Sequence, residues 1–525
     1  MARHITALIG TLVLVTMVAP RPAAQGQTAQ AVLQAVAQAM GTNTLKCVTY
    51  TGAGYFGIVG QNYDIRDDWA RVELANYSRT LNFEERSSRE ERVIRQGNNP
   101  PRGGGGIPIQ GEQRAVEFVA DKVAWTQPGA MPVPAPAAAE MRQLDMWLNP
   151  HGFVKAAMMP GANPVLITRY ESGALGGLSS IPMRRLNIIS ITVLGKYRVN
   201  ATINDQNLIE RVQTWVPNPV RGDMNYEGEF TQWRDVSGVK FPGNFHHHQD
   251  WDDETQPPNY NGGHNRITFT VKDITVNQCA ATPVPDAART ATVPAVQVQT
   301  TKVADGVYYL TGGSHHSVAV EFRDFTTLVE APQDERRTLA VIEAVYKVIP
   351  NKPIRYVVNS HHHFDHLGGI RTAFHEGATI VTHRSNHDFY KQEVLTYATR
   401  TLEPDRLSLY PPTEFAEGYQ LETVEMKGTI SDGTRNLDVY YLQGSPHAEG
   451  MVVAYLPREK MLIEADVYTP PAPDAQMPAM PPAAAVNLYN NVLAYKLDVS
   501  TILPLHGRMV PWSDFMRFIG KAGTN

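Results

Sequence analysis

Four residues that could bind metal ions lie within six consecutive positions of this chain. The stretch reads H-x-H-x-D-H and supplies His361, His363, Asp365 and His366. In an extended backbone His361 and His363 point to the same side, while the other two turn toward a neighbouring point. Imidazole and carboxylate ligands together suit zinc or a similar divalent ion. The spacing predicts one loop that serves two adjacent metals, and the alternative is a solvated cluster of histidines.

The surrounding elements indicate a rigid support for this stretch. Residues 355–359 read as a short buried strand, and the histidines begin where it ends. Metal and ligand sites in α/β sheets gather just beyond the carboxyl ends of strands. Gly368 and Gly369 follow, and glycine allows the backbone to pass tightly before the next strand, which is predicted over residues 378–382.

Three later residues have ligand chemistry and also follow apolar runs. His447 lies in a turn after a strand predicted over residues 437–442, Asp466 ends the run at 461–466, and His506 follows the run at 501–505. Each residue alone is more typical of a turn, a helix cap or a protein surface. Their shared position at strand ends indicates that they join the same site.

This order of ligands resembles that of the metallo-β-lactamase fold superfamily, over roughly residues 296–525. The implied ligands are His361, His363 and His447 for a first zinc, Asp365, His366 and His506 for a second, and Asp466 as a bridge. The implied fold is a four-layer αββα sandwich with the metals at one edge of two packed sheets. Strand-like segments and a helix predicted from residues 332–334 to Pro350 agree with an α/β domain.

Two adjacent zinc ions predict hydrolysis. Zinc lowers the pKa of bound water to about 7, so a hydroxide held between two ions can attack an electrophilic centre near neutral pH. Asp365 is expected to be the catalytic residue, because it can bind the second metal and orient the hydroxide. The resemblance implies two divalent cofactor ions, with Zn²⁺ preferred over iron or manganese, and a small-molecule substrate.

The residue at position 466 narrows the substrate class. A bridging aspartate there resembles the lactonase, thioesterase and phosphodiesterase branches of the superfamily, whereas true zinc β-lactamases tend to carry cysteine or another residue. We therefore predict hydrolysis of a small ester, lactone, thioester or related bond. A true β-lactamase and a non-catalytic periplasmic carrier are the alternatives.

Several other segments carry weaker expectations. His315 and His316 lie in a predicted turn that borders the active site in this fold, and they are candidate substrate contacts. The triplet at residues 246–248 is expected on an exposed loop or a strand edge. Residues 469–485, with Met477 and Met480, could form a lid over the metals or a floppy insert.

The amino terminus resembles a secretory signal peptide over residues 1–26. Its apolar run, from Ile5 to Ala19, is shorter than the about 20 residues that span a bilayer. We expect a periplasmic or secreted protein without stable membrane insertion. In an oxidising compartment Cys47 and Cys279 could form a disulfide, or each could be a small buried hydrophobe.

Composition and charge describe a folded chain of 525 residues with more than one domain. It is 42% hydrophobic and 19% charged, and its formal charge of −5 without a Lys/Arg run argues against a nucleic-acid partner. Pro- and Ala-rich residues 280–299 are expected to link a β-rich domain at 27–279 to a hydrolase domain at 300–525. The sequence leaves the oligomeric state open.

The first domain is expected to be mainly antiparallel β. A short helix at residues 31–40 precedes many strand-like stretches, an order that resembles the half-barrel of periplasmic lipoprotein carriers. Two inserts interrupt the strands, one at residues 98–108 with four consecutive glycines and one at residues 127–139. Both are expected to be flexible.

Overall fold

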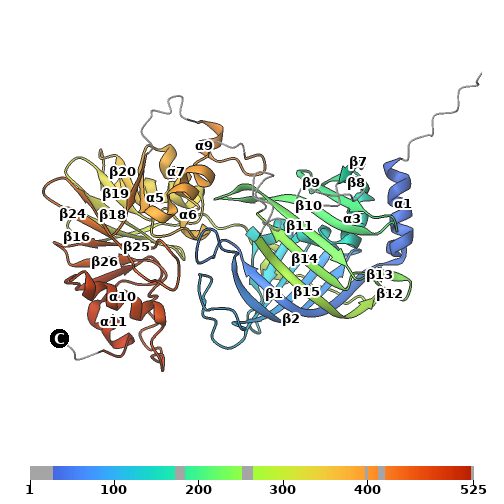
Figure 1. The fold of residues 1–525 in the computed structure, drawn as a ribbon, viewed down its shortest axis with the longest axis horizontal. Coiled ribbons are helices and arrows are strands. Elements are labelled where there is room, and N and C mark those ends of the chain that lie inside the picture. Colours follow the sequence, from blue (N-terminus) through green and yellow to red (C-terminus); the bar gives the residue numbers. More distant parts are fainter. Residues whose placement is uncertain (1–27, 172–183, 251–263, 397–399, 412–419, 522–525) are drawn as a thin grey trace, which may run out of the picture.

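The computed structural model describes residues 28–171, 184–250, 264–396, 400–411 and 420–521. Two β-rich parts lie side by side in Figure 1, the first in blue to green and the second in yellow to red. The signal peptide expected over residues 1–26 falls outside the described residues. Among the described helices, none is both long and apolar enough to cross a bilayer.

The first part is built on one 13-stranded sheet with the order β6-β5-β4-β3-β2-β1-β15-β14-β11-β10-β9-β8-β7. Every neighbouring pair is antiparallel, which confirms the expected antiparallel domain. The strands are β1 (Cys47–Ile58), β2 (Ala70–Asn82), β3 (Ser87–Arg95), β4 (Gln113–Ala120), β5 (Val123–Thr126), β6 (Val133–Pro134), β7 (Val165–Glu171), β8 (Arg184–Val193), β9 (Tyr197–Ile203), β10 (Ile209–Asn218), β11 (Gly222–Thr231), β14 (Asn244–Gln249) and β15 (His264–Val276). A separate hairpin consists of β12 (Arg234–Val236) and β13 (Val239–Phe241). The likeness to lipoprotein carriers stays a prediction.

Three helices pack on this sheet: α1 (Ala29–Met40), α2 (Ala139–Trp147) and α3 (Pro150–Ala157). The predicted first helix is confirmed, and its ends have clear causes. The Thr28 hydroxyl accepts a hydrogen bond from Ala31 N, and Gly41 ends the helix in the left-handed region at φ 72°. The helix buries Val32, Leu33 and Val36 against the sheet.

A disulfide closes the first part. Cys47, at the start of β1, is bonded to Cys279, just after β15. Because β1 and β15 are antiparallel neighbours, their outer ends meet and bring the two cysteines together. The two cysteines therefore form a disulfide and are not separate buried hydrophobic residues.

The histidine triplet is not on an exposed loop or an edge, so that expectation is wrong. His246, His247 and His248 lie in β14, which pairs with β11 on one side and β15 on the other. Alternation along the strand turns His247 inward, where its Nδ1 lies 2.7 Å from the Tyr226 hydroxyl. The three residues were misplaced because histidine has little preference for strands, whereas long-range pairing decides the position.

The second part contains two packed sheets. The first has β16 (Gln299–Ala304), β17 (Val307–Thr311), β18 (Ser317–Glu321), β19 (Thr326–Val329), β20 (Ile354–Val358), β21 (Thr379–His383) and β22 (Leu421–Val424). The second has β23 (Lys427–Ser431), β24 (Asn436–Tyr441), β25 (Val452–Leu456), β26 (Met461–Glu464), β27 (Thr501–Pro504) and β28 (Val510–Pro511). The helices are α5 (Glu335–Val348), α6 (Phe364–Leu367), α7 (Ile370–His375), α8 (His387–Phe389), α9 (Arg406–Leu409), α10 (Ala483–Ala494) and α11 (Trp512–Phe518).

The layers of this part are helix, sheet, sheet and helix, as the αββα prediction requires (Figure 1). Alternate residues of β18 face opposite layers: Val318 and Val320 pack toward the second sheet, and Ala319 packs toward α5. On the other outer face, α10 and α11 insert Leu488 and Phe515 into the core between the layers. The predicted helix before Pro350 is α5, which Asp334 caps by accepting a hydrogen bond from Arg337 N.

The segment expected to be a linker contains one short helix, α4 (Asp286–Arg289), before β16 begins. This helix contacts β5 and β6 at the edge of the large sheet, and Ala288 is buried there. The segment is therefore held against the first part along at least one turn.

Candidate metal centre

The predicted ligands converge because the strands before them end at one edge of the packed sheets. His361 and His363 follow β20, His447 lies between β24 and β25, Asp466 follows β26, and His506 follows β27. These strands are largely buried between the layers, so their apolar side chains hold the following loops in place.

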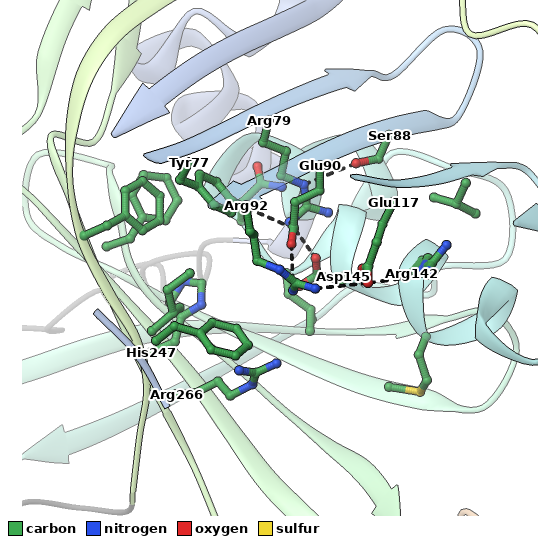
Figure 2. A pocket seen from close by; sticks show the side chains of 18 of the residues that line it. Tyr77, Arg79, Ser88, Glu90, Arg92, Glu117, Arg142, Asp145, His247 and Arg266 are labelled. Atoms are coloured by element: carbon green, nitrogen blue, oxygen red, sulfur yellow. Dashed lines mark hydrogen bonds and ion pairs between the residues drawn. The ribbon is translucent and has the colours of Figure 1, made fainter. Parts of the chain in front are cut away.

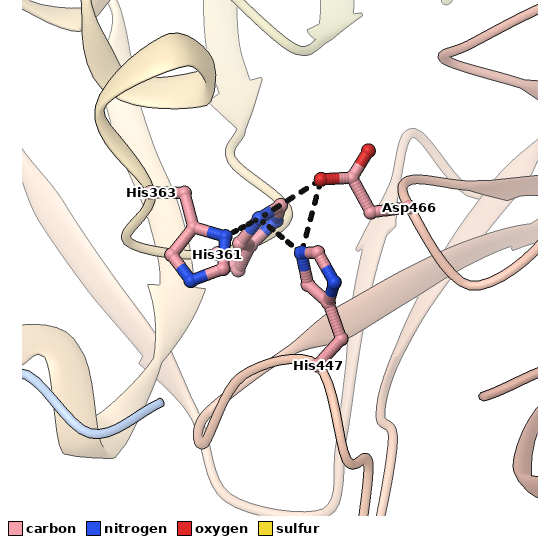
Figure 3. Close-up of side chains that lie close together, drawn as sticks. All are labelled: His361, His363, His447 and Asp466. Carbon is pink, nitrogen blue, oxygen red and sulfur yellow. Dashed lines mark hydrogen bonds and ion pairs between the residues drawn. The ribbon is translucent and has the colours of Figure 1, made fainter. Parts of the chain in front are cut away.

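One cluster consists of His361, His363, His447 and Asp466, whose ligand atoms all lie within 4.8 Å of one another (Figure 3). His361 Nε2 is 2.9 Å from His363 Nδ1 and 3.2 Å from His447 Nε2. Asp466 Oδ2 lies 3.0 Å from His447 Nε2. This is the ligand set that the resemblance implied for a first metal, with the bridging carboxylate beside it.

A second cluster shares the same carboxylate. Asp466 Oδ2 is 3.2 Å from His366 Nε2, and Asp466 Oδ1 is 2.7 Å from His506 Nε2. The two histidine Nε2 atoms are 3.2 Å apart. Asp466 therefore lies between the clusters, as expected of a bridging ligand, and its backbone has a left-handed φ of 60°, which is strained for a non-glycine residue.

Asp365 lies beside the second cluster and is held by two hydrogen bonds. Its Oδ1 accepts from Gln61 Nε2 at 2.7 Å, and its Oδ2 accepts from His315 Nε2 at 3.1 Å. Burial would raise the pKa of this carboxyl, but the His315 hydrogen bond and the nearby His366 lower it below its usual range. The group of ligand atoms around the second position contains His315 with His366 and His506, and Asp365 is not part of that group.

Hydrogen bonds on the outer nitrogens orient the histidines. In each case one nitrogen donates outward, so the other nitrogen is left facing the cluster. The outward bonds run from His366 Nδ1 to Glu330 Oε2 (2.9 Å), from His506 Nδ1 to Ser314 O (2.8 Å), from His363 Nε2 to Asn62 O (2.9 Å) and from His361 Nδ1 to Ser360 Oγ (2.9 Å). The arrangement selects for each ring the nitrogen that a metal would meet.

Glu330 is the centre of this support, and the sequence reasoning missed its role. It is fully buried, follows β19, and accepts hydrogen bonds from His366 Nδ1, Ser360 Oγ and Asn359 Nδ2. Its backbone φ of 76° lies in the left-handed region. A charged residue at the carboxyl end of a buried strand was the available signal.

The donor set fits a pair of divalent cations. With their Nδ1 protons committed outward, His366 and His506 turn two Nε2 lone pairs toward each other, and these repel unless a proton or a cation lies between them. Burial and the neighbouring imidazoles lower the pKa of His361 and His363, which favours the neutral form that binds metals. Imidazole nitrogens with carboxylate oxygens suit zinc, iron or manganese.

The first part of the chain reaches this site through the loop after β1. Besides the Gln61 and Asn62 bonds, the Gly60 carbonyl accepts a hydrogen bond from Phe364 N at 3.3 Å. Gly60 has a φ of 68°, and a Cβ there would lie 2.2 Å from Phe364 Cγ. The loop therefore lies directly against the H-x-H-x-D-H stretch.

The glycine-rich insert also lies at the site, although it was expected to be only a flexible insert. Gly103 N donates to Pro446 O at 3.2 Å, and Gly104 N donates to Gln61 O at 3.0 Å. A Cβ on Gly104 would lie 1.9 Å from Gln61 Oε1 and 2.7 Å from the His363 ring. Glycine is needed here because the backbone approaches a ligand too closely for any side chain.

Close to the candidate metal centre, a buried arginine of the second part forms hydrogen bonds with the first part. Arg400 donates to the carbonyl oxygens of Asn218, Pro219 and Val220 at 2.9, 2.8 and 2.7 Å. Its side chain is 6% exposed and also lies 3.5 Å from Asp405. The end of β10 is thus held beside the metal centre.

A cavity of about 690 Å³ opens between these segments. Its lining residues are Ile58, Val59, Gln61, Gly105, Gly106, Ile107, Asn218, Pro219, Gln333, Phe364, Asp365, His447, Asp466, Thr469 and His506. Both parts of the chain contribute, and the four potential ligands among them lie at its wall. The cavity is therefore the place where a substrate could meet the metal centre.

Two other predicted site features, His316 and residues 469–485, lie mostly outside the cavity wall. His316 is buried and is not among the residues that line the cavity, and its ring nitrogens lie next to the Tyr309 hydroxyl (2.7 Å) and Gly313 O (3.2 Å). Of the segment at residues 469–485, only Thr469 lines the cavity, and the Met480 side chain is 82% exposed. Of the two alternatives for this segment, the lid is not seen in this arrangement of the described residues.

A family model described as "Metallo-beta-lactamase superfamily" matches residues 310–468. Among solved structures, the chain is similar to a metallo-beta-lactamase from Pontibacter korlensis, with 18% identity and a TM-score of 0.33 over 44% of this chain and 100% of that chain. It is also similar to a metallo-beta-lactamase from Hirschia baltica (17% identity, TM-score 0.32, 43% of this chain and 97% of that chain). A third similar structure is the rubredoxin oxygen:oxidoreductase of Desulfovibrio gigas (17% identity, TM-score 0.31, 43% of this chain and 60% of that chain).

No curated protein matches the chain. The matched range contains the H-x-H-x-D-H stretch, His447 and Asp466, and it ends before His506. The resemblance inferred from the ligand spacing is thereby confirmed: residues 310–468, within the C-terminal half, match the family model of the metallo-beta-lactamase superfamily.

Proposed function

We propose that this protein is an exported hydrolase that uses two divalent metal ions, with zinc preferred, to cleave a small ester, lactone or thioester. The observation that carries the proposal is the position of Asp466, whose two carboxylate oxygens lie between two groups of converging histidine nitrogens at the wall of a cavity. When bound, such ions polarise the bond under attack and lower the pKa of water.

In this proposal, different side chains around the metal ions have different roles. Asp365 is held as a carboxylate by Gln61 and His315, and it can accept and orient the proton of an attacking water. Glu330 keeps His366 in the tautomer that turns Nε2 inward. The apolar side chains of Ile58, Ile107 and Phe364 limit the access of bulk water to the cavity.

The charge of the cavity wall favours neutral substrates. Among its described lining residues none is lysine or arginine, so no side chain of the wall offers a cation that could pair with a carboxylate or phosphate remote from the metal ions. Ester, lactone and thioester groups carry no charge and need no such partner. This composition therefore favours esters, lactones and thioesters over phosphodiesters. It also favours them over β-lactam antibiotics, which carry a carboxylate that needs a cationic partner.

Export is part of the proposal and is supported by the Cys47–Cys279 disulfide. Disulfides of this structural kind persist in oxidising compartments and are rare in the cytosol. The segment before Thr28 has the apolar pattern of a signal peptide.

The decisive experiment compares hydrolysis by the zinc-loaded full-length chain of a neutral aryl ester, a lactone, a thioester and a chromogenic cephalosporin. Asp466→Ala and chelator-treated protein are the blanks. We expect turnover of at least one neutral substrate that both blanks abolish. Turnover of the cephalosporin alone would establish the β-lactamase alternative. A protein that binds two ions and hydrolyses none of the four would contradict the proposed function.

A further inference from the structure

A second cavity lies inside the first part of the chain, on the inner side of the large sheet. It has a volume of about 220 Å³ and is lined from several strands and from α2. One side of it is apolar and aromatic, with Phe56, Phe118, Phe245 and Phe269. The other side carries an unusual number of charged groups for the inside of a domain (Figure 2).

Most of these charges neutralise one another. Arg79 pairs with Asp145 at 2.5 Å and with Glu90 at 3.5 Å, and Arg92 pairs with Glu90 at 3.0 Å. Glu117 completes the network with two arginines, Arg92 at 3.0 Å and Arg142 at 3.5 Å. Three arginines are thus matched with three carboxylates.

Arg266 is the fourth arginine of the cavity and is left out of that network. Among the described residues no carboxylate lies within ion-pair distance of it, and its guanidinium makes one hydrogen bond, to Gly57 O at 2.8 Å. The carbon at the centre of the guanidinium lies 4.2 Å from the centre of the Phe56 ring. Figure 2 shows Arg266 apart from the dashed ion pairs. Burial lowers its pKa to about 10, so it stays charged at neutral pH.

His247 offers a second unused donor in the same cavity. Burial raises the pKa of Tyr226, so its hydroxyl stays protonated, and its hydrogen-bond partner is His247 Nδ1 at 2.7 Å. If the hydroxyl donates to Nδ1, the proton of the neutral ring is on Nε2. That Nε2 atom is buried and has no hydrogen-bond partner in the described part of the chain.

We propose that this cavity binds a small organic acid, with its carboxylate at Arg266 and His247 and its aromatic or aliphatic portion against the phenylalanine side chains. A partly buried cation with no ion-pair partner among the described residues and an unpartnered donor are both costly, and one carboxylate would satisfy both. A guanidinium fork is suited to two carboxylate oxygens. The site is separate from the metal centre and does not depend on the proposed hydrolase function.

The test uses phenylacetate and octanoate as probes, with phenylacetamide as the uncharged control of the same shape. Calorimetry and thermal unfolding of the full-length chain are expected to show one-to-one binding of at least one acid and none of the amide. Arg266→Gln should weaken binding at least about tenfold. Lys272→Gln, which removes an exposed cation from the same strand β15, should leave it unchanged.

Two results would overturn the proposal. One is the absence of binding of both acids by the wild-type chain, a measurement that does not depend on whether a variant folds. The other is equal binding of phenylacetate and phenylacetamide, which would show that charge is not recognised. Binding of the acid by Asp466→Ala at wild-type strength would separate this site from the metal centre.

Discussion

Gln61 donates a hydrogen bond of 2.7 Å to Asp365, a residue 304 positions later in the chain. The donor lies in a loop of the first part, and the acceptor lies in the metal-binding stretch of the second part. One residue further on, Asn62 O accepts a hydrogen bond from His363 at 2.9 Å. The candidate metal centre is therefore assembled from both parts of the chain, and the first part contributes to the geometry of its candidate ligands.

Replacing Gln61 with alanine should lower kcat/KM for the best substrate about tenfold, because Asp365 loses one of its two orienting hydrogen bonds. Gln61→Glu should be more harmful, since it places a second negative charge beside that carboxylate. Steady-state kinetics together with metal analysis test this prediction. Gln206→Ala, at an exposed turn, is the control. Equal values of kcat/KM for Gln61→Ala and the wild type would mean that this hydrogen bond does not contribute to catalysis.

Gly104→Ala and Gly129→Ala form a matched pair in the first part. A Cβ on Gly104 would lie 1.9 Å from Gln61 Oε1 and 2.7 Å from the His363 ring, whereas a Cβ on Gly129 would meet nothing within 4 Å. We expect Gly104→Ala to displace the loop, weaken metal binding and reduce activity at least about tenfold. Gly129→Ala should behave like the wild type. Similar metal contents and rates for both variants would contradict the role given to the insert.

Glu330→Gln should weaken the binding of the metal next to His366 by about 10- to 100-fold. The amide keeps the shape of the side chain but can no longer accept equally well from His366, Ser360 and Asn359. Zinc affinity, measured by competition with a coloured chelator, reports this directly and without a substrate. Glu343→Gln, on the exposed side of α5, is the control. An unchanged zinc affinity in Glu330→Gln would rule out this supporting role.

Asp405 should make the protein sensitive to acid. Burial alone would raise the pKa of this carboxyl, but Arg371, which hydrogen-bonds to it, and Arg400 together lower it to about 2 from the ordinary 3.8. A carboxyl with a lowered folded-state pKa stabilises the fold above pH 3.8, and this stabilisation disappears as the pH falls toward 2. The full shift corresponds to about 2 kcal/mol, and partial exposure to solvent reduces the expected contribution to about 1 kcal/mol.

Asp405→Asn should therefore unfold at lower temperature than the wild type at pH 7, and the difference should shrink between about pH 4 and pH 2. Thermal unfolding across this pH range measures the effect. Asp324→Asn, at an exposed position, should show no such trend. A difference that grows as the pH falls would show that the sign of the argument is wrong.

Much of the C-terminal half could be predicted from local patterns. Apolar runs such as residues 461–464 are read correctly as strands because their burial on both sides requires uninterrupted hydrophobic side chains. The residue after such a strand must emerge at the sheet edge, and this placed Asp466 correctly. The first part gave weaker signals, and His247 was assigned to the surface although it faces the interior of the sheet.

The amino-acid sequence alone determined which residues could bind the metals and which sheet edge presents them, because ligand type and strand ends are local properties. Only the tertiary structure decided that Gln61 orients Asp365, that Asn62 supports His363 and that Gly104 leaves room beside them. These contributions come from a side-chain amide, a backbone carbonyl and a missing Cβ, none of which has a distinctive local pattern. Their effect exists only where segments about 300 positions apart are brought together by the contact between the two parts of the chain.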